Sequence, residues 1–553
     1  MRGIGAWAPP IILAAALSVA LWAWLGRPVA LPPAPEAKLH CASYTPFRGD
    51  QTPLDQTLTI PPQQIAEDLK QLKPITNCVR TYAVNQGLDQ VVPLAAQLGM
   101  KVLLGIWIGS KSSDNELQIK KAVELAHAYP GAIRAIIVGN EVLLRGEQTG
   151  ETLATLAARV RKESGLPVTY ADVWEYWLRA PQALRDSVDF VTIHVLPYWE
   201  DQPLPVSAGV AHLQEIVNKV RAAFPGKEVM VGETGWPSAG RWREDAAPSL
   251  VNQARYLRDF LVYAKGADLD YNFIEAFDQP WKRWQEGTAG GYWGIYGEDR
   301  QPKFSWTDPV TEYPGWPVRA TLSVVLGIGI LAMVRFWRGQ PGIFRRVAAS
   351  LGAMLTGLCL VLHFPHAWLV SRNDWEWLLE CLIGIETLAT GTLLIAALLS
   401  DRRNLANGSF LEAISWLRHP RRLPEARTVI ALLRLAALIG AATVSLGLCF
   451  DPRYRDFPLA AYILPAIGFA FADLSGKLWT ALPDRREEAV LSLILVGTAG
   501  FILWNEGPFN LEAMAWCILT VLLALPGIAA WRGLCLDLKR EMKSGRKVAK
   551  IAA

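Results

Sequence analysis

The 553-residue sequence has few cysteines and little net charge. Its seven cysteines include no CxxC pair and no Cys/His spacing suited to zinc, so no metal site is predicted. The formal net charge of +4 is small for this length. The basic residues after position 330 fall in short clusters between apolar runs, which argues against a nucleic-acid partner. No glycine-rich phosphate loop and no D-x-D-type synthase motif stands out, so we predict no cofactor and no glycan synthesis by this chain alone.

Apolar runs of membrane-spanning length lie at both ends of the chain. The stretch from Gly3 to Gly26 carries no charge and is followed by no convincing A-x-A site, so residues 1–30 are predicted to form an uncleaved anchor and the start of a Pro-rich linker. A domain over 317–531 is predicted to hold seven further spans, and 532–553 form a basic tail. These spans are 317–335, 347–370, 378–399, 428–450, 459–479, 489–504 and 513–531.

The loops between these runs differ in their content of basic residues. Alternate loops are rich in arginine, and the intervening loops RNDWEW, DPRYRDF and NEGPFN are poor in it. This alternation predicts eight spans in a lipid membrane with both termini in the cytoplasm, and residues 38–312 outside it. In a Gram-negative bacterium the protein would lie in the inner membrane with this domain in the periplasm. The basic loops carry Arg335, Arg338, Arg345, Arg346; Arg402, Arg403, Arg418, Arg421, Arg422, Arg427; and Arg485, Arg486.

Residues 38–312 alternate short β-type runs with longer amphipathic stretches such as 115–129 and 207–225. Eight such repeats predict an α/β fold, a (β/α)₈ TIM barrel, which is followed by the all-α multi-span domain. Cys41 and Cys78 fall on adjacent predicted strands, and a disulfide between them is left open. The predicted strands are 40–47, 78–84, 101–109, 133–141, 167–174, 190–199, 228–236 and 271–281.

Polar groups recur where these strands end. A barrel gathers that end of every strand on one face, where active sites are built. Ionisable groups at the ends of buried strands are costly unless they line a site. The groups concerned are Arg80, Tyr82, Asn140, Glu141, His194, Tyr198, Trp199, Glu233, Glu275 and Asp278.

Two of these groups, Glu141 and Glu233, end strands four and seven, which lie across the mouth of a barrel. Glycoside cleavage needs one protonated carboxyl group and one ionised carboxylate. We therefore predict Glu141 as the general acid/base, Glu233 as the nucleophile, and Asn140 as a contact to the sugar 2-hydroxyl. The competing interpretation is that each glutamate simply pairs with a nearby Arg or Lys.

The motifs IIVGNEV and VMVGETGWPSAG, with VRTYAV, VLPYWE, FIEAFDQPWK and GGYWGIY in order, resemble glycoside hydrolase family 17. The resemblance covers about 38–310 and implies a retaining β-1,3-glucanase barrel with Glu141 as proton donor and Glu233 as nucleophile. One position departs from the pattern: many relatives read FDEPWK or FDENWK where this chain has Gln279. A carboxylate expected near the nucleophile is therefore an amide here.

Other residues are weaker candidates for the site. Tyr198, Trp281 and Lys282 are predicted to bind sugar, with packing as the alternative for each. Arg80 and Tyr82 are predicted to orient the nucleophile, whereas His194 is interpreted as a hydrogen-bonded residue at a strand end. Some of Trp107, Trp174, Trp177, Trp199, Trp242, Trp284 and Trp293 are expected to line a glucan-binding cleft.

The membrane context bears on the reaction. A barrel held at the outer face of a membrane is well placed to remodel β-1,3-glucan emerging from a synthase, so transglycosylation is favoured over hydrolysis and a glucan synthase is a candidate partner. Hydrolysis remains the first alternative. The second is a glucan-export protein whose intramembrane Glu380, Glu386 and Asp473 mark a polar path.

Overall fold

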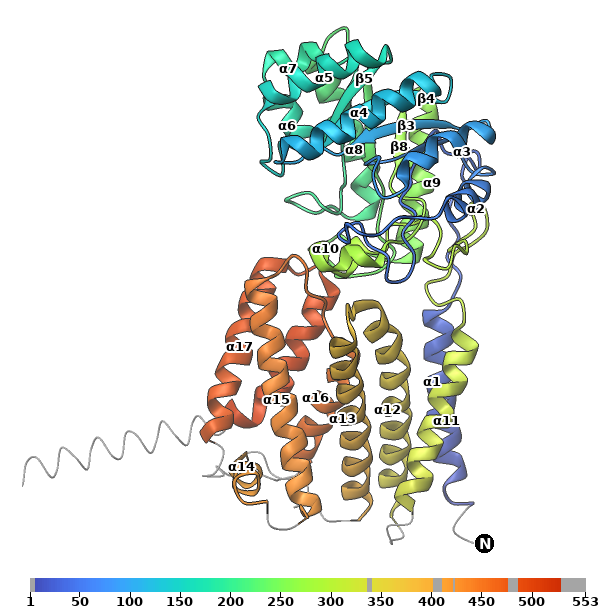
Figure 1. Cartoon of the computed structure of the whole chain (residues 1–553). Coiled ribbons are helices and arrows are strands. Elements are labelled where there is room, and N and C mark those ends of the chain that lie inside the picture. Colours follow the sequence, from blue (N-terminus) through green and yellow to red (C-terminus); the bar gives the residue numbers. More distant parts are fainter. Residues whose placement is uncertain (1–4, 336–340, 401–409, 421–422, 476–485, 529–553) are drawn as a thin grey trace, which may run out of the picture. The chain divides into compact units, whose positions relative to one another are not determined.

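The computed structural model describes residues 5–335, 341–400, 410–420, 423–475 and 486–528 (Figure 1). The chain forms two compact units. Residues Pro28–Thr311 make one, and Met1–Arg27 together with Glu312–Ala553 make the other. The predicted tail 532–553 and the side chain of Asp473 lie outside the described part.

The first unit is a closed barrel of eight parallel strands in sequence order, which confirms the predicted (β/α)₈ fold. The barrel closes because β1 pairs with both β2 and β8, with Ala42 opposite Val79 on one side and Phe273 on the other. The strands are β1 Ala42–Ser43, β2 Cys78–Arg80, β3 Lys101–Ile106, β4 Ile133–Asn140, β5 Val168–Val173, β6 Val191–His194, β7 Val229–Thr234 and β8 Tyr271–Phe273.

Most strands are shorter than the sequence predicts. The run 190–199 leaves the sheet at His194 and the run 271–281 leaves it at Phe273, so Tyr198, Glu275 and Asp278 lie in loops. The prediction was too long because apolar side chains in these loops, such as Phe277, are buried as deeply as strand residues. Apolar periodicity alone does not separate the two cases.

Helices lie between the strands of the barrel. On α4, which falls in the amphipathic stretch 115–129, the apolar side chain of Leu117 is 70% exposed. The buried face of α4 instead contains Ile119, Ala122 and Leu125. The helices of this unit are α2 Pro62–Leu72, η1 Leu88–Gln90, α3 Val91–Gln97, α4 Ser112–Ala128, α5 Gly150–Ser164, α6 Trp174–Arg179, α7 Gln182–Ser187, α8 Val206–Ala223, α9 Leu250–Gly266, η2 Pro280–Lys282 and α10 Arg283–Gly290.

The amino ends of β1 and β2 are joined by a disulfide between Cys41 and Cys78, the pair that the sequence left open. The disulfide packs in a small apolar cluster, separate from the main core, whose other buried members are Leu103, Ala135, Ile137, Ala171 and Met230. On β3 and β4, alternate residues such as Val102 and Ile136 belong to the main core instead. This period of two separates the barrel interior from the layer beneath the helices.

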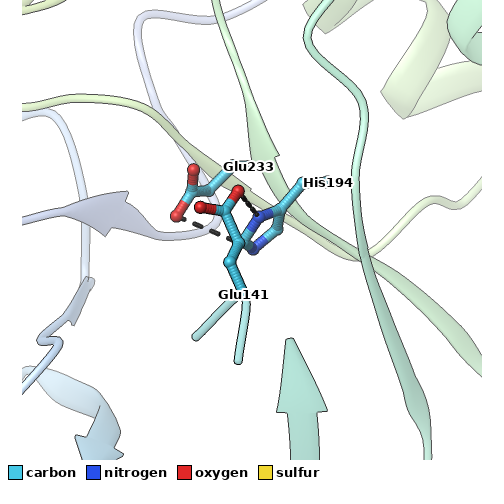
Figure 2. Close-up of side chains that lie close together, drawn as sticks. All are labelled: Glu141, His194 and Glu233. Carbon is cyan, nitrogen blue, oxygen red and sulfur yellow. Dashed lines mark hydrogen bonds and ion pairs between the residues drawn. The ribbon is translucent and has the colours of Figure 1, made fainter. Parts of the chain in front are cut away.

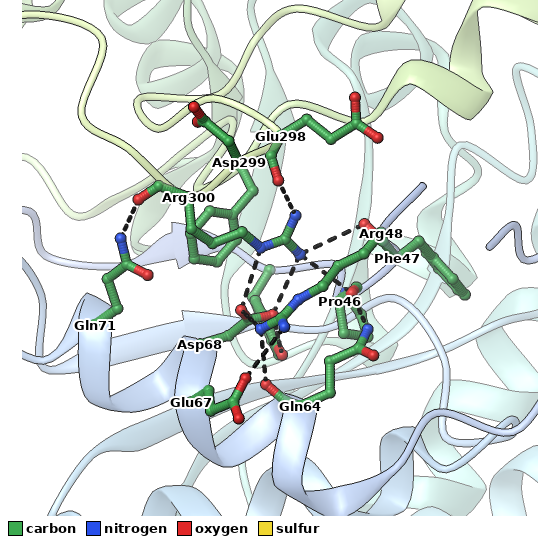
Figure 3. A network of polar contacts seen from close by, with 12 residues as sticks. Pro46, Phe47, Arg48, Gln64, Glu67, Asp68, Gln71, Glu298, Asp299 and Arg300 are labelled. Atoms are coloured by element: carbon green, nitrogen blue, oxygen red, sulfur yellow. Dashed lines mark hydrogen bonds and ion pairs between the residues drawn. The ribbon is translucent and has the colours of Figure 1, made fainter. Parts of the chain in front are cut away.

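A buried carboxylate, Asp68 on α2, ties this helix to the chain that follows β1 and β8 (Figure 3). Its oxygens accept from Arg48 at 2.5 Å, from Arg300 at 3.2 Å and from the Tyr44 hydroxyl at 3.1 Å. Because two guanidinium groups and one phenol surround it, the buried charge of Asp68 is compensated. This network fixes segments far apart in the sequence around the barrel mouth.

The Pro-rich segment before β1 belongs to the barrel unit. Val29 pairs with Val310 in an antiparallel bridge, and the Ala34 amide donates to the Trp306 carbonyl at 3.0 Å. The buried guanidinium of Arg258 on α9 donates to carbonyls in both of these paired segments, Leu31 in the first and Ser305 in the second. The chain therefore enters and leaves the barrel through one paired segment.

The second unit is helical, and seven described helices are long and apolar enough to cross a membrane. The predicted span 459–479 corresponds to α16, in which the apolar stretch Leu459–Phe471 is shorter than these seven helices. Helices α11, α12 and α13 pack side by side (Figure 1), and Trp22 of α1 donates to Ser323 of α11 at 3.0 Å. The helices are α1 Ala8–Leu25, α11 Trp316–Arg335, α12 Ile343–Val370, α13 Asp374–Leu399, α14 Phe410–Arg418, α15 Ala426–Phe450, α16 Leu459–Ser475, α17 Arg486–Glu506 and an unlabelled helix Leu511–Ile528.

Candidate active site

Glu141 is the residue that follows β4, and a local distortion directs it to the barrel mouth. The pairing of β4 with β5 shifts register between Ile137 and Asn140. Within this shift Gly139 has φ +91°, and a Cβ there would lie 2.7 Å from Cγ2 of Val142. Glu141 itself has φ +52°. The glycine of VGNE is therefore a steric requirement for the turn that presents Asn140 and Glu141.

Glu233 lies near the end of β7, also after a glycine. A Cβ on Gly232 would lie 2.5 Å from Cγ2 of Thr192 and 3.1 Å from Cδ2 of His194. Glycine at this position therefore leaves room for the His194 ring from the neighbouring strand β6. The carbonyl of Gly232 accepts a hydrogen bond from Arg80 at 2.8 Å.

His194 lies between the two glutamates (Figure 2). Its Nδ1 is 3.0 Å from Oε1 of Glu141, and its Nε2 is 3.6 Å from Oε1 of Glu233. One oxygen of each glutamate and a ring nitrogen of His194 all lie within 4.8 Å of one another. The structure thus brings together the two carboxylates that the sequence placed on strands four and seven.

The carboxylate of Glu233 is 5% exposed and is held by side-chain donors from β2 and the residues after it. Arg80 Nη1 donates to Oε1 at 3.1 Å, and the Tyr82 hydroxyl donates to the same oxygen at 2.8 Å. Behind Tyr82, Asn272 donates to Ser43 at 2.7 Å, and the Ser43 and Tyr82 hydroxyls lie 2.8 Å apart. Burial and the negative charge of Glu233 raise the pKa of Tyr82 well above its ordinary value, so Tyr82 stays a proton donor.

Glu141 has a different environment. Burial acts to raise the pKa of Glu141, but the hydrogen bond and charge of His194 and the charges of Arg145 and Arg80 outweigh it. The net effect is a pKa below the ordinary value of a glutamate. Glu141 is therefore ionised at neutral pH, and its protonated form accumulates as the pH falls.

Asn140 faces the same space as Glu141. Its Oδ1 accepts from Arg80 Nη2 at 2.5 Å, so one guanidinium links Asn140 to Glu233. With the oxygen engaged, the amide nitrogen of Asn140 is the atom left to meet a sugar hydroxyl.

Lys282 and Trp281 lie in η2, beyond β8. Lys282 Nζ pairs with Glu275 Oε1 at 2.8 Å and its side chain is 13% exposed. Trp281 is half-buried and donates to Gln279 Oε1 at 2.8 Å. Gln279 is fully buried and donates to the Thr45 carbonyl at 3.0 Å; none of its described hydrogen bonds reaches Glu233.

Although position 279 is an amide, two other acidic groups act on Glu141 and Glu233. Glu275 and Glu286 both lie within electrostatic reach of Glu233. Burial, with Glu275, Glu141 and Glu233 nearby, raises the pKa of Glu286 to about 7 against the effect of Lys282. Sequence reasoning missed Glu286 because α10 follows the last strand and carries no pattern that distinguishes it from a surface acid.

Tyr198, which the sequence predicts to bind sugar, is packed inside the barrel unit. Its ring is fully buried against Trp199, Trp236 and Trp293, and its hydroxyl donates to the Arg241 carbonyl at 2.7 Å. Neither the ring face nor the hydroxyl is left for a ligand. The neighbouring Trp199 is partly exposed and stacks on Trp293.

The cluster of Glu141, His194 and Glu233 also has the spacing of a three-ligand metal site. Arg80 argues against a cation there, because its Nη1 lies 3.1 Å from Glu233 Oε1 and 3.4 Å from His194 Nε2. The guanidinium already supplies the positive charge that an ion would bring.

Known proteins resemble the barrel unit. Residues 41–294 match the family model described as the BtgE/BtgC glycoside hydrolase domain. A glucan 1,3-beta-glucosidase of Arthroderma benhamiae is 30% identical over 261 residues, 43% of this chain and 82% of that protein. One from Saccharomyces cerevisiae is 25% identical over 263 residues, 43% of this chain and 83% of that protein. A solved glycoside hydrolase family 17 beta-1,3-glucanosyltransferase from Rhizomucor miehei is 27% identical, with 48% of this chain and 95% of that chain covered and a TM-score of 0.43.

Proposed function

This chain belongs to glycoside hydrolase family 17, and we propose that its barrel cleaves β-1,3-glucan with retention of configuration at the anomeric carbon. The observation that carries the proposal is the approach of Glu141 and Glu233, whose nearest oxygens lie within 4.8 Å. Inverting enzymes separate their carboxyl groups by about 6.5–9.5 Å to admit a water, whereas retaining enzymes hold them about 5–5.5 Å apart.

In the first step, formation of the glucosyl ester, Glu141 and Glu233 have different roles. Protonated Glu141 gives its proton to the glycosidic oxygen as the bond to the anomeric carbon breaks, and a Glu233 oxygen forms a new bond to that carbon. Arg80 and Tyr82 direct Oε1 of Glu233 and balance its charge. The product is a glucosyl ester on Glu233 and a released glucan with a free hydroxyl.

In the second step Glu141, now ionised, removes a proton from the incoming hydroxyl, whose oxygen displaces Glu233 from the anomeric carbon. We favour a second glucan chain over water as the source of this hydroxyl. Support comes from aromatic surface near the mouth: Trp107, directly after β3, is 40% exposed, and Trp284 on α10 is 53% exposed. Such rings offer apolar faces for pyranose stacking. Hydrolysis is the alternative, which the glucan 1,3-beta-glucosidase relatives favour.

We place this reaction outside the cytoplasm, on a membrane. The Cys41–Cys78 disulfide suits an oxidising compartment. The arginine-poor loops adjoin helix ends with exposed aromatic side chains, which suit a lipid–water interface. These are Trp368, Trp375, Phe450, Trp504 and Phe509, each at least 66% exposed. In that location the enzyme would remodel nascent glucan, with a glucan synthase as a candidate partner.

The export alternative gains no specific support. Of the carboxylates that suggested a polar path, Glu380 lies 3.6 Å from His363 and Glu386 accepts from Thr390 at 2.9 Å. Paired groups of this kind are also what helix packing requires in a membrane. Export therefore stays an untested prediction.

The experiment is to incubate the full chain in detergent with laminari-oligosaccharides and to measure product lengths and linkages. Products longer than the substrate, or newly linked, support transfer, and products that are only shorter mean hydrolysis. Glu233→Gln is the control. If this variant leaves the product profile unchanged, the proposed two-glutamate reaction is wrong.

A further inference from the structure

Two buried polar residues on β5, Tyr170 and Asp172, lie beside the segment that carries Glu141. Tyr170 is 1% exposed and Asp172 is fully buried. The Tyr170 hydroxyl donates to Asp172 Oδ2, and Oδ1 accepts from the Val173 amide at 2.8 Å. The reaction steps above do not use this pair.

The pair is bonded to the backbone of the segment that carries Glu141. The Leu143 amide donates to the Tyr170 hydroxyl at 2.9 Å, and the Leu144 amide donates to Asp172 Oδ2 at 3.4 Å. Between these two residues, the Ala171 carbonyl accepts from the Glu141 amide at 2.8 Å. Three consecutive residues of β5 therefore hold the segment 141–144.

This segment needs such support because Glu141 has φ +52°, a left-handed conformation that side-chain-bearing residues rarely adopt. Strained backbone persists only where its surroundings determine it. On the other side of the segment, Arg145 donates to the carbonyls of Asn140 and Ile108. The acid/base is thus held from β5 on one side and by Arg145 on the other.

Five polar or charged groups act electrostatically on Glu141. His194 of β6, Arg145 of its own loop and Arg80 of β2 are cationic or proton-donating, and all three lower the pKa of Glu141. Glu286 of α10 and Asp172 of β5 oppose them by like-charge repulsion. Burial is the main cause that raises the pKa of Asp172 to about 6, and the Glu141 charge adds to it. Coulomb repulsion is mutual, so an ionised Asp172 favours the protonated form of Glu141.

We propose that Tyr170 and Asp172 are positioning residues that fix the backbone of Glu141 and place a negative charge behind its carboxyl group. The inference rests on the proposed function, in which Glu141 must bind and release a proton in every turnover.

The test compares Asp172→Asn and Tyr170→Phe in the full chain on two donors. Laminari-oligosaccharide needs a proton from Glu141, whereas 2,4-dinitrophenyl β-laminaribioside has a leaving group that needs none. For Asp172→Asn we expect kcat on the oligosaccharide to fall about 10- to 100-fold with KM within about 2-fold. We expect the basic limb of its kcat/KM profile on the oligosaccharide to move to lower pH. On the dinitrophenyl donor kcat/KM, which reports the glycosylation step alone, should stay nearly unchanged.

Tyr170→Phe removes the hydroxyl but keeps the carboxyl group of Asp172. We expect it to lower kcat on the oligosaccharide and to move the basic limb to lower pH by less than Asp172→Asn does, because the lost hydrogen bond only weakens the ionisation of Asp172. Asp270→Asn is the matched control, because it breaks a carboxylate pair with Arg134 at the opposite end of the barrel. It should leave both the pH profile and the substrate ratio as in the wild type.

Three results decide the inference. An unchanged pH profile in Asp172→Asn, or equal losses on the two donors, overturns it in favour of a purely structural role. If Asp172→Asn fails to fold, an equal loss on both donors in Tyr170→Phe overturns it as well. Failure of the proposed function is recognised separately, because Glu141→Gln and Glu233→Gln would then both keep full activity.

Discussion

The two sides of the barrel mouth hold their glutamates in different ways. Glu233 receives two hydrogen bonds on one oxygen from the side chains of Arg80 and Tyr82. Glu141 is held through its backbone, and its carboxylate has a single described hydrogen-bond partner, His194. The difference matches the demands of the reaction. A nucleophile remains an anion until it attacks, whereas an acid/base changes charge twice per turnover and is hindered by fixed donors.

The largest effects are expected when each carboxylate is removed in turn, which tests whether the two glutamates have different roles. Glu233→Gln should lower kcat/KM by more than about 10⁴-fold on every donor, because no group remains to form the ester. Glu141→Gln should lower kcat/KM about 10²- to 10⁴-fold on laminari-oligosaccharides but far less on 2,4-dinitrophenyl β-laminaribioside. Equal losses of both variants on both donors would contradict the division of roles.

Removing a donor from Glu233 tests the nucleophile side alone. Tyr82→Phe deletes one hydrogen bond to a charged oxygen, which is typically worth about 1.5–3 kcal/mol, so we expect kcat to fall roughly 10- to 100-fold. The loss should appear on both donors because it acts on ester formation. Tyr129→Phe, at an exposed position after α4, is the control and should change neither rate. A Tyr82→Phe loss confined to the oligosaccharide would assign Tyr82 to the acid side instead.

The pH profile tests the acid side. Since the pKa of Glu141 lies below its ordinary value, the protonated fraction falls as the pH rises through that low pKa. We therefore expect kcat/KM on laminari-oligosaccharides to rise as the pH is lowered from 7 toward 4.5. The dinitrophenyl donor should show no such rise in its glycosylation step. A basic limb above pH 7 in kcat/KM on the oligosaccharide would contradict a lowered pKa of Glu141, because kcat/KM reports the free enzyme.

Removing the disulfide at the opposite end of the barrel should lower stability but should not change the roles of the two glutamates. Replacing Cys41 and Cys78 by alanine removes a cross-link between positions 37 residues apart, which should cost roughly 3–4 kcal/mol of barrel stability. Thermal unfolding of the full chain in detergent should show an earlier barrel transition with little change in kcat at 25 °C. A large loss of kcat with unchanged unfolding would connect the disulfide to the mouth.

The smallest effect on the kinetics is expected from a substitution of Trp107, at the edge of the barrel mouth. Trp107 is 40% exposed, and one of its ring faces is covered by the Arg145 guanidinium at 4.2 Å from the ring centroid. Trp107→Ala should raise KM for long oligosaccharides about 3- to 10-fold and leave kcat nearly unchanged, as expected for the loss of one stacking contact. Equal KM changes for short and long donors would place Trp107 outside the substrate path.

The prediction from sequence succeeded where local pattern was enough and failed where side-chain packing decides. Tyr198 ends an apolar run at the expected place, yet its ring turns into a tryptophan cluster. Lys282 was expected to bind sugar and pairs with Glu275. His194 was interpreted as a hydrogen-bonded residue at a strand end, and its ring does form a hydrogen bond there. That its two nitrogens face Glu141 and Glu233 follows from the order of the strands in the barrel.

The repeated β/α units, the apolar runs at the chain ends and the positions of Glu141 and Glu233 at the ends of strands four and seven can be predicted from the sequence alone. These features depend on periodicity and on local steric rules, such as the glycine before each glutamate, and both can be read along one segment. The contacts of His194 with both glutamates, and those of Tyr170 and Asp172 with the segment 141–144, arise only in the folded barrel. These contacts depend on strand register across β4 to β7, which brings together residues 27 to 53 positions apart in the sequence. Arg80 reaches Glu233 across 153 positions because the barrel closes between β1 and β8.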